Sequence, residues 1–304
     1  MVVVRAKVLG FCMGVRRAVA LARAEAKSPA KKFYTLGPLI HNPQALAELE
    51  AGGAQILDES RLPESLCGAS VIIRAHGVSP KTENALRLRG AAIIDATCPR
   101  VKASQLKARE LAEAGYLLFL AGEKSHAETV GILGYAEAGA PSRGGLPCLV
   151  VGSADEAGGA AEKLRRELGA SANAIRTALI AQTTISDGEY RAIAGAIVRF
   201  FPGLEIAETI CAATRERQES LRELLGRADA VVVAGGKDSA NTRRLFAIAE
   251  AAGKPCALAE TAADVPPEFS RFKTVGLAAG ASTPDAVIDA IERALLGLPL
   301  PEQL

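Results

Sequence analysis

Three cysteines lie where an apolar run gives way to an amphipathic helical pattern. Cys12 lies in LGFCMGVRRAV, Cys98 in IDATCPRVKA and Cys211 in ETICAATRERQ. Pro99 suits the first position of a helix and Thr214 suits a helix cap, which would place Cys98 and Cys211 near helix N-termini. The partial positive charge and free amides found there stabilise thiolates and anionic metal-sulfur clusters. These three cysteines are therefore candidate ligands of an iron-sulfur cluster.

The other three cysteines lie in stretches with no cap, Gly-rich turn or polar companion. Cys67 is in SLCGAS, Cys148 in LPCLVV and Cys256 in KPCALA. A cysteine in such an apolar setting is usually a small buried hydrophobic residue. We expect that role for all three.

All three histidines of the chain fall in loops that follow predicted strands. His41 lies in GPLIHNPQ, His76 in RAHGVSP and His126 in GEKSHAETVG, where Glu128 follows two residues later in a Gly-bounded loop. This position makes Glu128 a candidate proton donor. No HExxH spacing is present, so a zinc site would need histidines and cysteines to converge without a local motif. Zinc stays open as the minor alternative.

Three further turns carry short polar side chains where strands should end. They are AQTTIS with Thr183 and Thr184, GGKDSAN with Ser239 and Asn241, and GAST with Ser282. The glycines of the last two turns resemble phosphate-cradling loops, but neither GxxxxGK[ST] nor GxGxxG is present, so a nucleotide fold is only weakly supported. Hydroxyl groups, amides and helix N-termini of this kind can bind a diphosphate.

The elements that must position these residues alternate along the chain as in parallel sheets covered by helices, so we predict an α/β fold. We expect strands within 2–10, 70–77, 91–97, 116–122, 148–152, 177–183, 229–236 and 273–280. We expect helices at 14–27, 101–114, 155–168, 187–200, 214–226 and 239–252. Ligands of open α/β sheets bind beyond the carboxyl ends of the strands, so the six polar loops could face one site.

One candidate cysteine and two polar loops fall in each third of the chain. We therefore expect three similar α/β units with mainly parallel sheets, arranged as a pseudo-threefold trefoil. The predicted units are 14–97, 98–208, and 209–304 together with 1–13.

The composition points to a small partner. The chain has 304 residues, with 36 basic and 34 acidic side chains, so no strong field favours nucleic acid or a membrane surface. The first ten residues hold an apolar run of only three valines before Arg5, and no apolar stretch is long enough to span a bilayer. We expect a cytoplasmic protein.

With these motifs assembled, the sequence closely resembles the 4-hydroxy-3-methylbut-2-enyl diphosphate reductase family of the non-mevalonate isoprenoid pathway. The resemblance covers nearly the whole chain. It rests on nine motifs in the family's order: GFCMGVRRAV, HNPQ, AHGVSP, DATCPRV, SHAETVG, QTTIS, ICAATRERQ, GGKDSANTRRL and AGASTP. Each motif alone is weak evidence, but nine in order are very specific.

The resemblance implies a trefoil of α/β units around one [4Fe-4S] cluster with Cys12, Cys98 and Cys211 as its protein ligands, which leaves one iron without a protein ligand. It implies a catalytic group in which Glu128 delivers protons, Thr183 orients the substrate hydroxyl or a water, and His126 takes part. The implied substrate-binding residues are His41, His76, His126, Thr183, Ser239, Asn241 and Ser282.

The implied reaction is a two-electron, two-proton reductive dehydroxylation that yields isopentenyl and dimethylallyl diphosphates. The resemblance implies that electrons arrive one at a time from a ferredoxin or flavodoxin, and the lack of a flavin or nicotinamide motif in the sequence agrees with an external donor. Three positions depart from the family's pattern: Ala240 replaces a serine, Ala212 a tyrosine and Asp238 an asparagine. We expect these departures to alter substrate affinity and to leave the reaction intact.

Two readings from other classes of protein remain open. One is a zinc-dependent hydrolase of phosphate esters, with some of the cysteines and histidines as ligands. The other is a noncatalytic iron-sulfur sensor whose polar loops bind a regulatory diphosphate.

Overall fold

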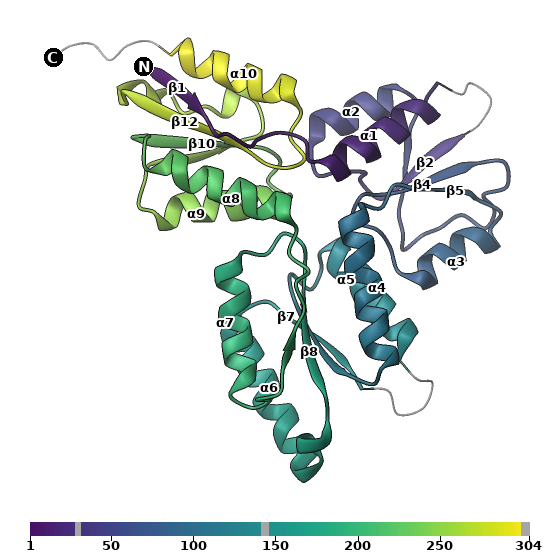
Figure 1. The fold of residues 1–304 in the computed structure, drawn as a ribbon. Helices are drawn as coiled ribbons and strands as arrows, with labels where there is room; N and C mark the ends of the chain where they lie inside the picture. Colours follow the sequence, from purple (N-terminus) through teal and green to yellow (C-terminus); the bar gives the residue numbers. More distant parts are fainter. Residues whose placement is uncertain (28–31, 141–145, 299–304) are drawn as a thin grey trace. The chain divides into compact units, whose positions relative to one another are not determined.

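The computed structural model describes residues 1–27, 32–140 and 146–298, and these form three separate four-stranded sheets (Figure 1). Every strand pairing in the three sheets is parallel. The first sheet has the order β1(Val2–Arg5), β12(Thr274–Ala279), β10(Ala230–Ala234), β11(Cys256–Ala259). The second has the order β3(Gln55–Leu57), β2(Phe33–Leu36), β4(Ser70–Ile73), β5(Ala92–Asp95). The third has the order β7(Cys148–Val151), β6(Leu117–Ala121), β8(Thr177–Ala181), β9(Glu205–Ile206). The α/β class predicted from the sequence is confirmed.

Helices connect the strands, as parallel pairing requires. The described helices are α1(Met13–Glu25), α2(Pro43–Ala51), α3(Pro80–Leu88), α4(Pro99–Glu113), α5(Ala127–Gly139), α6(Ala154–Leu168), α7(Asp187–Val198), α8(Ala212–Leu225), α9(Ala240–Ala251) and α10(Asp285–Leu296). The described ranges also contain three short 3₁₀ segments: η1(Gly169–Ala174), η2(Ala262–Asp264) and η3(Pro267–Arg271). No helix in the described ranges is long and apolar enough to span a membrane.

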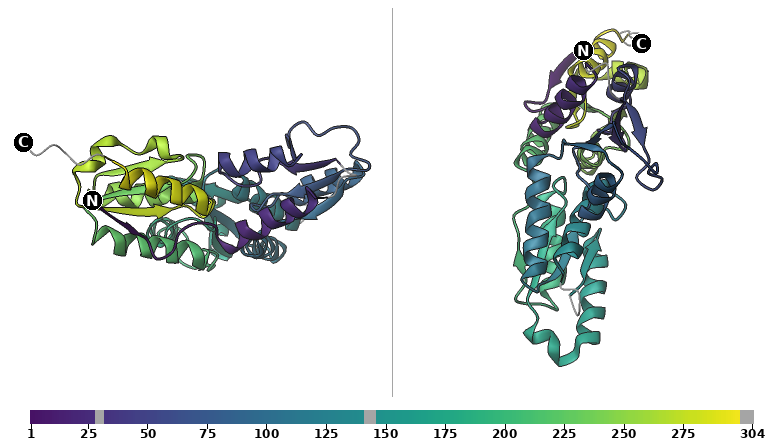
Figure 2. Two further views of the ribbon diagram at one scale, coloured as in Figure 1. Left: turned by 90° about the horizontal axis from the view of Figure 1, so that it is seen from above. Right: turned by 90° about the vertical axis from the view of Figure 1, so that its right-hand side faces the viewer.

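The sheets are covered on their faces by these helices, and the cores lie between helix and sheet. In the third sheet, Phe119 and Leu179 pack with Ile193 of α7, and Leu118 and Ile180 belong to a separate cluster with α4 and α5. The first sheet is built in the same way, with α10 on one face and α8 and α9 on the other (Figures 1 and 2). The central strands are buried on both faces, which explains their continuous apolar sequences.

The described residues divide into two compact bodies. Body 1 is drawn from Met1–Arg16, Ile40–Gly52 and Ala212–Leu304, and body 2 from Arg17–Leu39 and Gly53–Cys211. The first sheet lies in body 1, where the N-terminal strand β1 pairs with β12 near the other end of the chain. The second and third sheets lie in body 2. The three-unit boundaries drawn from the sequence stay a prediction, as does the pseudo-threefold arrangement.

The sequence patterns predicted most of the described strands and α-helices and missed eight of them. All eight predicted strands exist, but β2, β3, β9 and β11 were not predicted, and they are two to four residues long. The six predicted helices exist with ends shifted by at most two residues, and four more were missed: α2, α3, α5 and α10. Short strands carry too little periodicity to stand out from loops.

Helix α5 is the most instructive of these omissions, because the sequence placed His126 and Glu128 in a loop. His126 is in fact the N-cap of α5 and Glu128 lies in its first turn. Gly131 and Gly134 weaken the helical signal, since glycine is a poor helix former. Both glycines lie where neighbours approach closely: an added Cβ would be 2.9 Å from Gln105 Nε2 and 2.4 Å from Ser79 Cβ, respectively. Tight packing therefore requires residues that local propensity disfavours.

Candidate functional site

The three candidate cysteines share one backbone arrangement. The N–H of Cys12 donates to the carbonyl of Ala281 at 3.1 Å, that of Cys98 to Ala75 at 2.9 Å and that of Cys211 to Thr183 at 3.0 Å. Thr183 is itself a predicted site residue. The other two acceptors, Ala281 and Ala75, directly precede the predicted site residues Ser282 and His76. Each cysteine turn is thus joined to a polar loop of the predicted site.

This arrangement follows from sheet topology. Strands β1, β5 and β9 are the edge strands of their sheets, and each leads into one of the three cysteines. Their neighbours β12, β4 and β8 lead into the polar loops. Parallel neighbours end at the same edge of a sheet, so each cysteine turn and its partner loop lie side by side. The same local arrangement of edge strand, cysteine turn and polar loop therefore occurs in each of the three sheets, although the sequence shows no clear repeat.

Each of these cysteines also lies at a helix N-terminus. Cys98 is the N-cap of α4, with Pro99 as its first residue, as predicted, and Cys12 and Cys211 immediately precede α1 and α8. The prediction that Thr214 caps a helix was wrong, because α8 already begins at Ala212 and Thr214 is buried in its first turn. Free amides and the helix dipole at these positions favour a negatively charged ligand set.

The chemistry of these three thiols fits an iron-sulfur cluster. None of the six cysteines, all within the described ranges, forms a disulfide, and Cys12, Cys98 and Cys211 are each partly exposed. Three thiolates with partial access suit cluster ligation, which requires deprotonated sulfur.

The remaining cysteines are built differently. Cys148 and Cys256 lie on strands β7 and β11. Burial raises the pKa of the Cys148 thiol to about 12, with Glu137 adding to the rise. Burial likewise raises the pKa of Cys256. Such thiols stay protonated and make poor ligands. Cys67 was expected to be buried but is exposed, and its thiol lies near the Arg89 carbonyl at 3.8 Å.

In body 2, His76 and His126 lie together at the ends of β4 and β6. Their ring centroids are 5.2 Å apart in an edge-to-face arrangement. The Nδ1 of His126 accepts the Glu128 N–H at 3.2 Å as the cap of α5. A neutral His126 that accepts at Nδ1 carries its proton on Nε2, so Nε2 is a hydrogen-bond donor.

Glu128 and Thr183 meet in the interior of the same body. Glu128 is 1% exposed and Thr183 is 5% exposed. The Thr183 N–H donates to Glu128 Oε1 at 2.5 Å and the Thr183 hydroxyl donates to Oε2 at 3.1 Å. Because the Thr183 carbonyl also accepts from Cys211, one residue links the candidate proton donor to a candidate cluster ligand.

In body 1, His41 lies between two of the predicted phosphate turns. The Ser282 hydroxyl donates to the His41 carbonyl at 3.2 Å and lies 3.4 Å from the Ser239 hydroxyl. Ser239 is the N-cap of α9 and accepts from Thr242 N–H at 3.3 Å. Asn42, next to His41, caps α2 through Ala45 N–H. These side chains gather at helix N-termini, where an anion is favoured.

The glycine turn before Ser239 explains why these loops come so close. Gly235 has φ of 145° and Gly236 packs against His41, so that a Cβ on Gly236 would be 2.5 Å from the His41 carbonyl oxygen. Asn241 is 5% exposed, and its amide nitrogen has no hydrogen-bond partner among the described residues. A buried donor without a partner is costly, so Asn241 is poised to bind an acceptor such as a phosphate oxygen.

The three departures from the family's pattern differ in surroundings. Ala240 is buried at the first position of α9, whereas Asp238 is exposed in the preceding turn. Ala212 is exposed at the first position of α8. Only Ala240 among the three thus lies where a missing hydroxyl changes a buried environment.

Sequence reasoning missed Gln182, which organises the loops of body 2. Gln182 is fully buried; its Oε1 accepts from Glu123 N–H at 3.0 Å and its Nε2 donates to Thr184 at 3.1 Å. The signal was available, because a glutamine at the end of an apolar strand must find buried partners.

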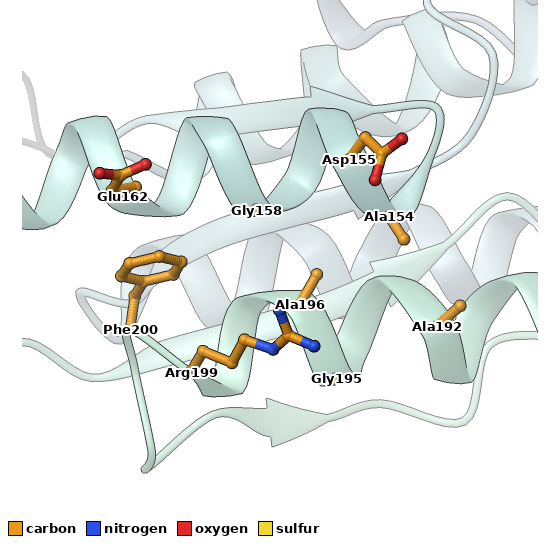
Figure 3. A pocket seen from close by; sticks show the side chains of 9 residues that line it. All are labelled: Ala154, Asp155, Gly158, Glu162, Ala192, Gly195, Ala196, Arg199 and Phe200. Atoms are coloured by element: carbon orange, nitrogen blue, oxygen red, sulfur yellow. The ribbon is translucent and has the colours of Figure 1, made fainter.

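A separate cavity of about 600 Å³ lies between α6 and α7 (Figure 3). Its lining combines small residues with a few charged ones: Ala154, Asp155, Gly158, Glu162, Ala192, Gly195, Ala196, Arg199 and Phe200. None of the predicted site residues lines it, so it is distinct from the candidate site.

Known proteins resemble this chain along most of its length. The family model described as LytB protein matches residues 3–296. The 4-hydroxy-3-methylbut-2-enyl diphosphate reductase of Treponema denticola is 44% identical over 97% of this chain and 99% of its own length. The Aquifex aeolicus protein of the same name is 40% identical over 93% and 92% of the two chains.

Two solved structures share the fold along almost the entire chain. The E-1-hydroxy-2-methyl-but-2-enyl-4-diphosphate reductase from Plasmodium falciparum has a TM-score of 0.86 at 25% identity, covering 98% of this chain and 89% of that one. A structure of (E)-4-hydroxy-3-methyl-but-2-enyl diphosphate reductase, the terminal enzyme of the non-mevalonate pathway, has a TM-score of 0.67 at 38% identity, covering 97% and 99%. The family model and these relatives together show that this chain belongs to the LytB family.

Proposed function

We propose that this protein reduces (E)-4-hydroxy-3-methylbut-2-enyl diphosphate to isopentenyl and dimethylallyl diphosphates, the last step of the non-mevalonate pathway. Two electrons and two protons replace the allylic C–O bond with C–H and release the hydroxyl as water. The observation that carries the proposal is the continuous link from Glu128 through Thr183 to Cys211. The names of the relatives support the choice of substrate.

Cys12, Cys98 and Cys211 are the residues that would hold a [4Fe-4S] cluster. Their partial exposure, helix-start positions and backbone-anchored turns support this assignment. When bound, the cluster would pass electrons to the substrate and offer an iron without a protein ligand as a Lewis acid.

Glu128 is the group that we assign to proton delivery. Two hydrogen bonds from Thr183 fix both carboxylate oxygens, so the acid meets the substrate in one orientation. Burial excludes bulk water from competing for the proton. Thr183 would in turn orient the leaving hydroxyl, or a water in its place, through its own hydroxyl.

The resemblance to the family assigns diphosphate binding to six residues: His41, His76, His126, Ser239, Asn241 and Ser282. The unpartnered amide of Asn241 and the helix N-terminus at Ser239 support this role. In body 2, the Nε2 donor of His126 supports it.

The electron donor would be a separate protein. A ferredoxin or flavodoxin fits the one-electron chemistry of an iron-sulfur enzyme, and a cytoplasmic location fits six cysteines without a disulfide.

The test is to measure iron, zinc and acid-labile sulfide per chain on protein purified without oxygen, together with turnover of the diphosphate by a low-potential reductant. About four irons and four sulfides are expected. Cys12→Ser, Cys98→Ser and Cys211→Ser should each lower both contents, whereas Cys67→Ser, Cys148→Ser and Cys256→Ser serve as matched controls. Zinc without sulfide would favour a hydrolase instead, and a redox-active cluster without turnover would indicate a sensor.

A further inference from the structure

Arg217 is a buried cation on α8, six residues after Cys211. Arg217 is only 4% exposed. One guanidinium nitrogen donates to the Gly10 carbonyl at 2.7 Å and another donates to the Ala213 carbonyl at 3.0 Å. The second bond lies within α8 itself, whereas the first reaches a different segment of body 1.

That segment is the turn that leads into Cys12. Gly10 has φ of 76°, a conformation that favours glycine, and a Cβ there would be 2.8 Å from Asp285 Oδ1. Two residues earlier, the Val8 N–H donates to the Ser220 hydroxyl at 3.0 Å. Ser220 and Arg217 lie one helical turn apart, so α8 contacts the turn at two points.

The turn has further anchors at its far end: the Cys12 N–H donates to the Ala281 carbonyl at 3.1 Å, and the exposed Arg16 side chain donates through Nε to the Phe11 carbonyl at 3.1 Å. The segment from Val8 to Cys12 contains no helix or strand, so its conformation depends on such bonds. Arg217, which donates to the Gly10 carbonyl in this segment, is both charged and buried. A charge-assisted hydrogen bond with restricted access to water is stronger than a neutral one.

We propose that Arg217 is a positioning residue that fixes the Cys12 turn by binding the Gly10 carbonyl. Its planar guanidinium bridges α8 and the turn, which a lysine ammonium on a flexible stem reproduces only in part. The relevance for catalysis rests on the proposed function, in which Cys12 holds the cluster. The anchoring of the turn does not depend on that function.

The experiment measures the reactivity of Cys12 in the metal-free full-length protein. Iodoacetamide alkylates the thiolate, and mass spectrometry of peptides follows Cys12 and Cys98 separately over time. Arg217→Met should raise the alkylation rate of Cys12 on the order of tenfold, because losing one charge-assisted bond lets the turn open more often. The rate at Cys98 should stay unchanged, and Arg217→Lys should give an intermediate rate at Cys12.

Arg222→Met is the matched control, because Arg222 lies on α8 with an exposed ion pair to Glu219. It should leave both rates at wild-type values. If Arg217→Met fails to fold, Ser220→Ala tests the same turn. It should raise the alkylation rate of Cys12 and leave that of Cys98 unchanged. Equal acceleration at Cys12 and Cys98 would indicate general loosening of the protein and would overturn the proposal, as would unchanged Cys12 reactivity.

A second readout uses protein reconstituted with iron and sulfide. Arg217→Met should lose iron faster than wild type during dilution into a chelator, and Arg217→Lys should partly restore retention. A wild-type protein that takes up no cluster would contradict the proposed function, while the alkylation result would still decide the role of Arg217. Wild-type retention in Arg217→Met would contradict the positioning role in the loaded protein.

Discussion

Thr183 binds Glu128 at two points and Cys211 at a third. Its backbone N–H and its hydroxyl donate to the two carboxylate oxygens at 2.5 and 3.1 Å, and its carbonyl accepts from the Cys211 N–H at 3.0 Å. A carboxylate held through both oxygens has little rotational freedom. Loss of either hydrogen bond from Thr183 would therefore give the proposed proton donor more rotational freedom.

Glu128→Gln should preserve the shape of the site and remove its acid. We expect kcat to fall by about 10²- to 10⁴-fold, the usual contribution of general acid catalysis, with little change in KM or iron content. Steady-state kinetics with a low-potential reductant would measure this. Glu110→Gln, at an exposed ion pair with Lys107, is the control. A kcat close to wild type in Glu128→Gln would remove Glu128 from the mechanism.

Thr183→Val and Thr183→Ser separate the hydroxyl from the backbone bonds. Both variants keep the backbone N–H to Glu128 and the carbonyl that binds Cys211, whereas valine lacks the hydroxyl. Thr183→Val should lower kcat on the order of tenfold or more through loss of one bond to a charged acceptor, and Thr183→Ser should stay near wild type. Comparison of kcat between the two variants checks this. A kcat near wild type in Thr183→Val would show that the hydroxyl is not needed.

Gly236→Ala should weaken substrate binding without changing the chemistry. The new methyl group would lie 2.5 Å from the His41 carbonyl oxygen, so the His41 loop must shift. We expect KM for the diphosphate to rise on the order of tenfold at nearly constant kcat, because a displaced donor loses its bond to phosphate. Gly188→Ala is the control, since nothing lies within 4 Å of its added methyl group. An unchanged KM in Gly236→Ala would mean that the loop adapts or that His41 does not bind the substrate.

Ala240→Ser restores the hydroxyl that this chain lacks relative to its family. Ala240 is 3% exposed and begins α9 directly after Ser239. A serine there offers one more donor beside the proposed phosphate site, so KM should fall severalfold with kcat unchanged. Substrate titration of the two proteins side by side would measure the effect. Identical KM and kcat would show that the missing hydroxyl has no consequence.

The Cys148 thiol should give the protein a specific pH dependence. Burial raises its pKa from an ordinary value of 9.0 to about 12. The folded state therefore binds this proton more tightly than the unfolded state, so the stabilisation is fully present below pH 9.0 and is lost as pH rises through about 12.

Urea unfolding of wild type and Cys148→Ala across this range provides the measurement. The free energy of unfolding of wild type should decrease relative to the variant as pH rises above 9.0. Alkylation of Cys148 in the native protein at neutral pH should be slow for the same reason. A constant difference in stability between the two proteins would contradict the raised pKa.

Local sequence determined most of the central strands, six of the helices and the chemical identity of the site. The apolar runs around Phe119, Leu179 and Val232 are buried on both faces, and such runs predict parallel strands wherever they occur. Pro99 predicted the start of α4, because a proline at the first helical position lacks only an amide that would be unpaired there. These signals depend on a few neighbouring residues, and a sequence displays them directly.

Signals that depend on packing were misread. Helix α5 carries glycines where neighbouring residues press against it, so its sequence resembles a loop. Thr214 resembles a cap, but α8 begins two residues earlier. Strands β3, β9 and β11 pair with a longer neighbour, and β2 pairs with a strand on each side, so their hydrogen bonds come from segments that their own few residues do not reveal.

The sequence by itself thus determined which residues carry the chemistry: three cysteines at helix starts, three histidines, and an acid beside one of them. Tertiary structure decided how they are joined. Glu128 and Thr183 are 55 residues apart in the chain, and the three cysteine turns are equivalent because each follows an edge strand paired with a strand that ends in a polar loop. Hydrogen bonds between parallel strands connect distant segments, and no local pattern of side chains specifies which segments will become neighbours.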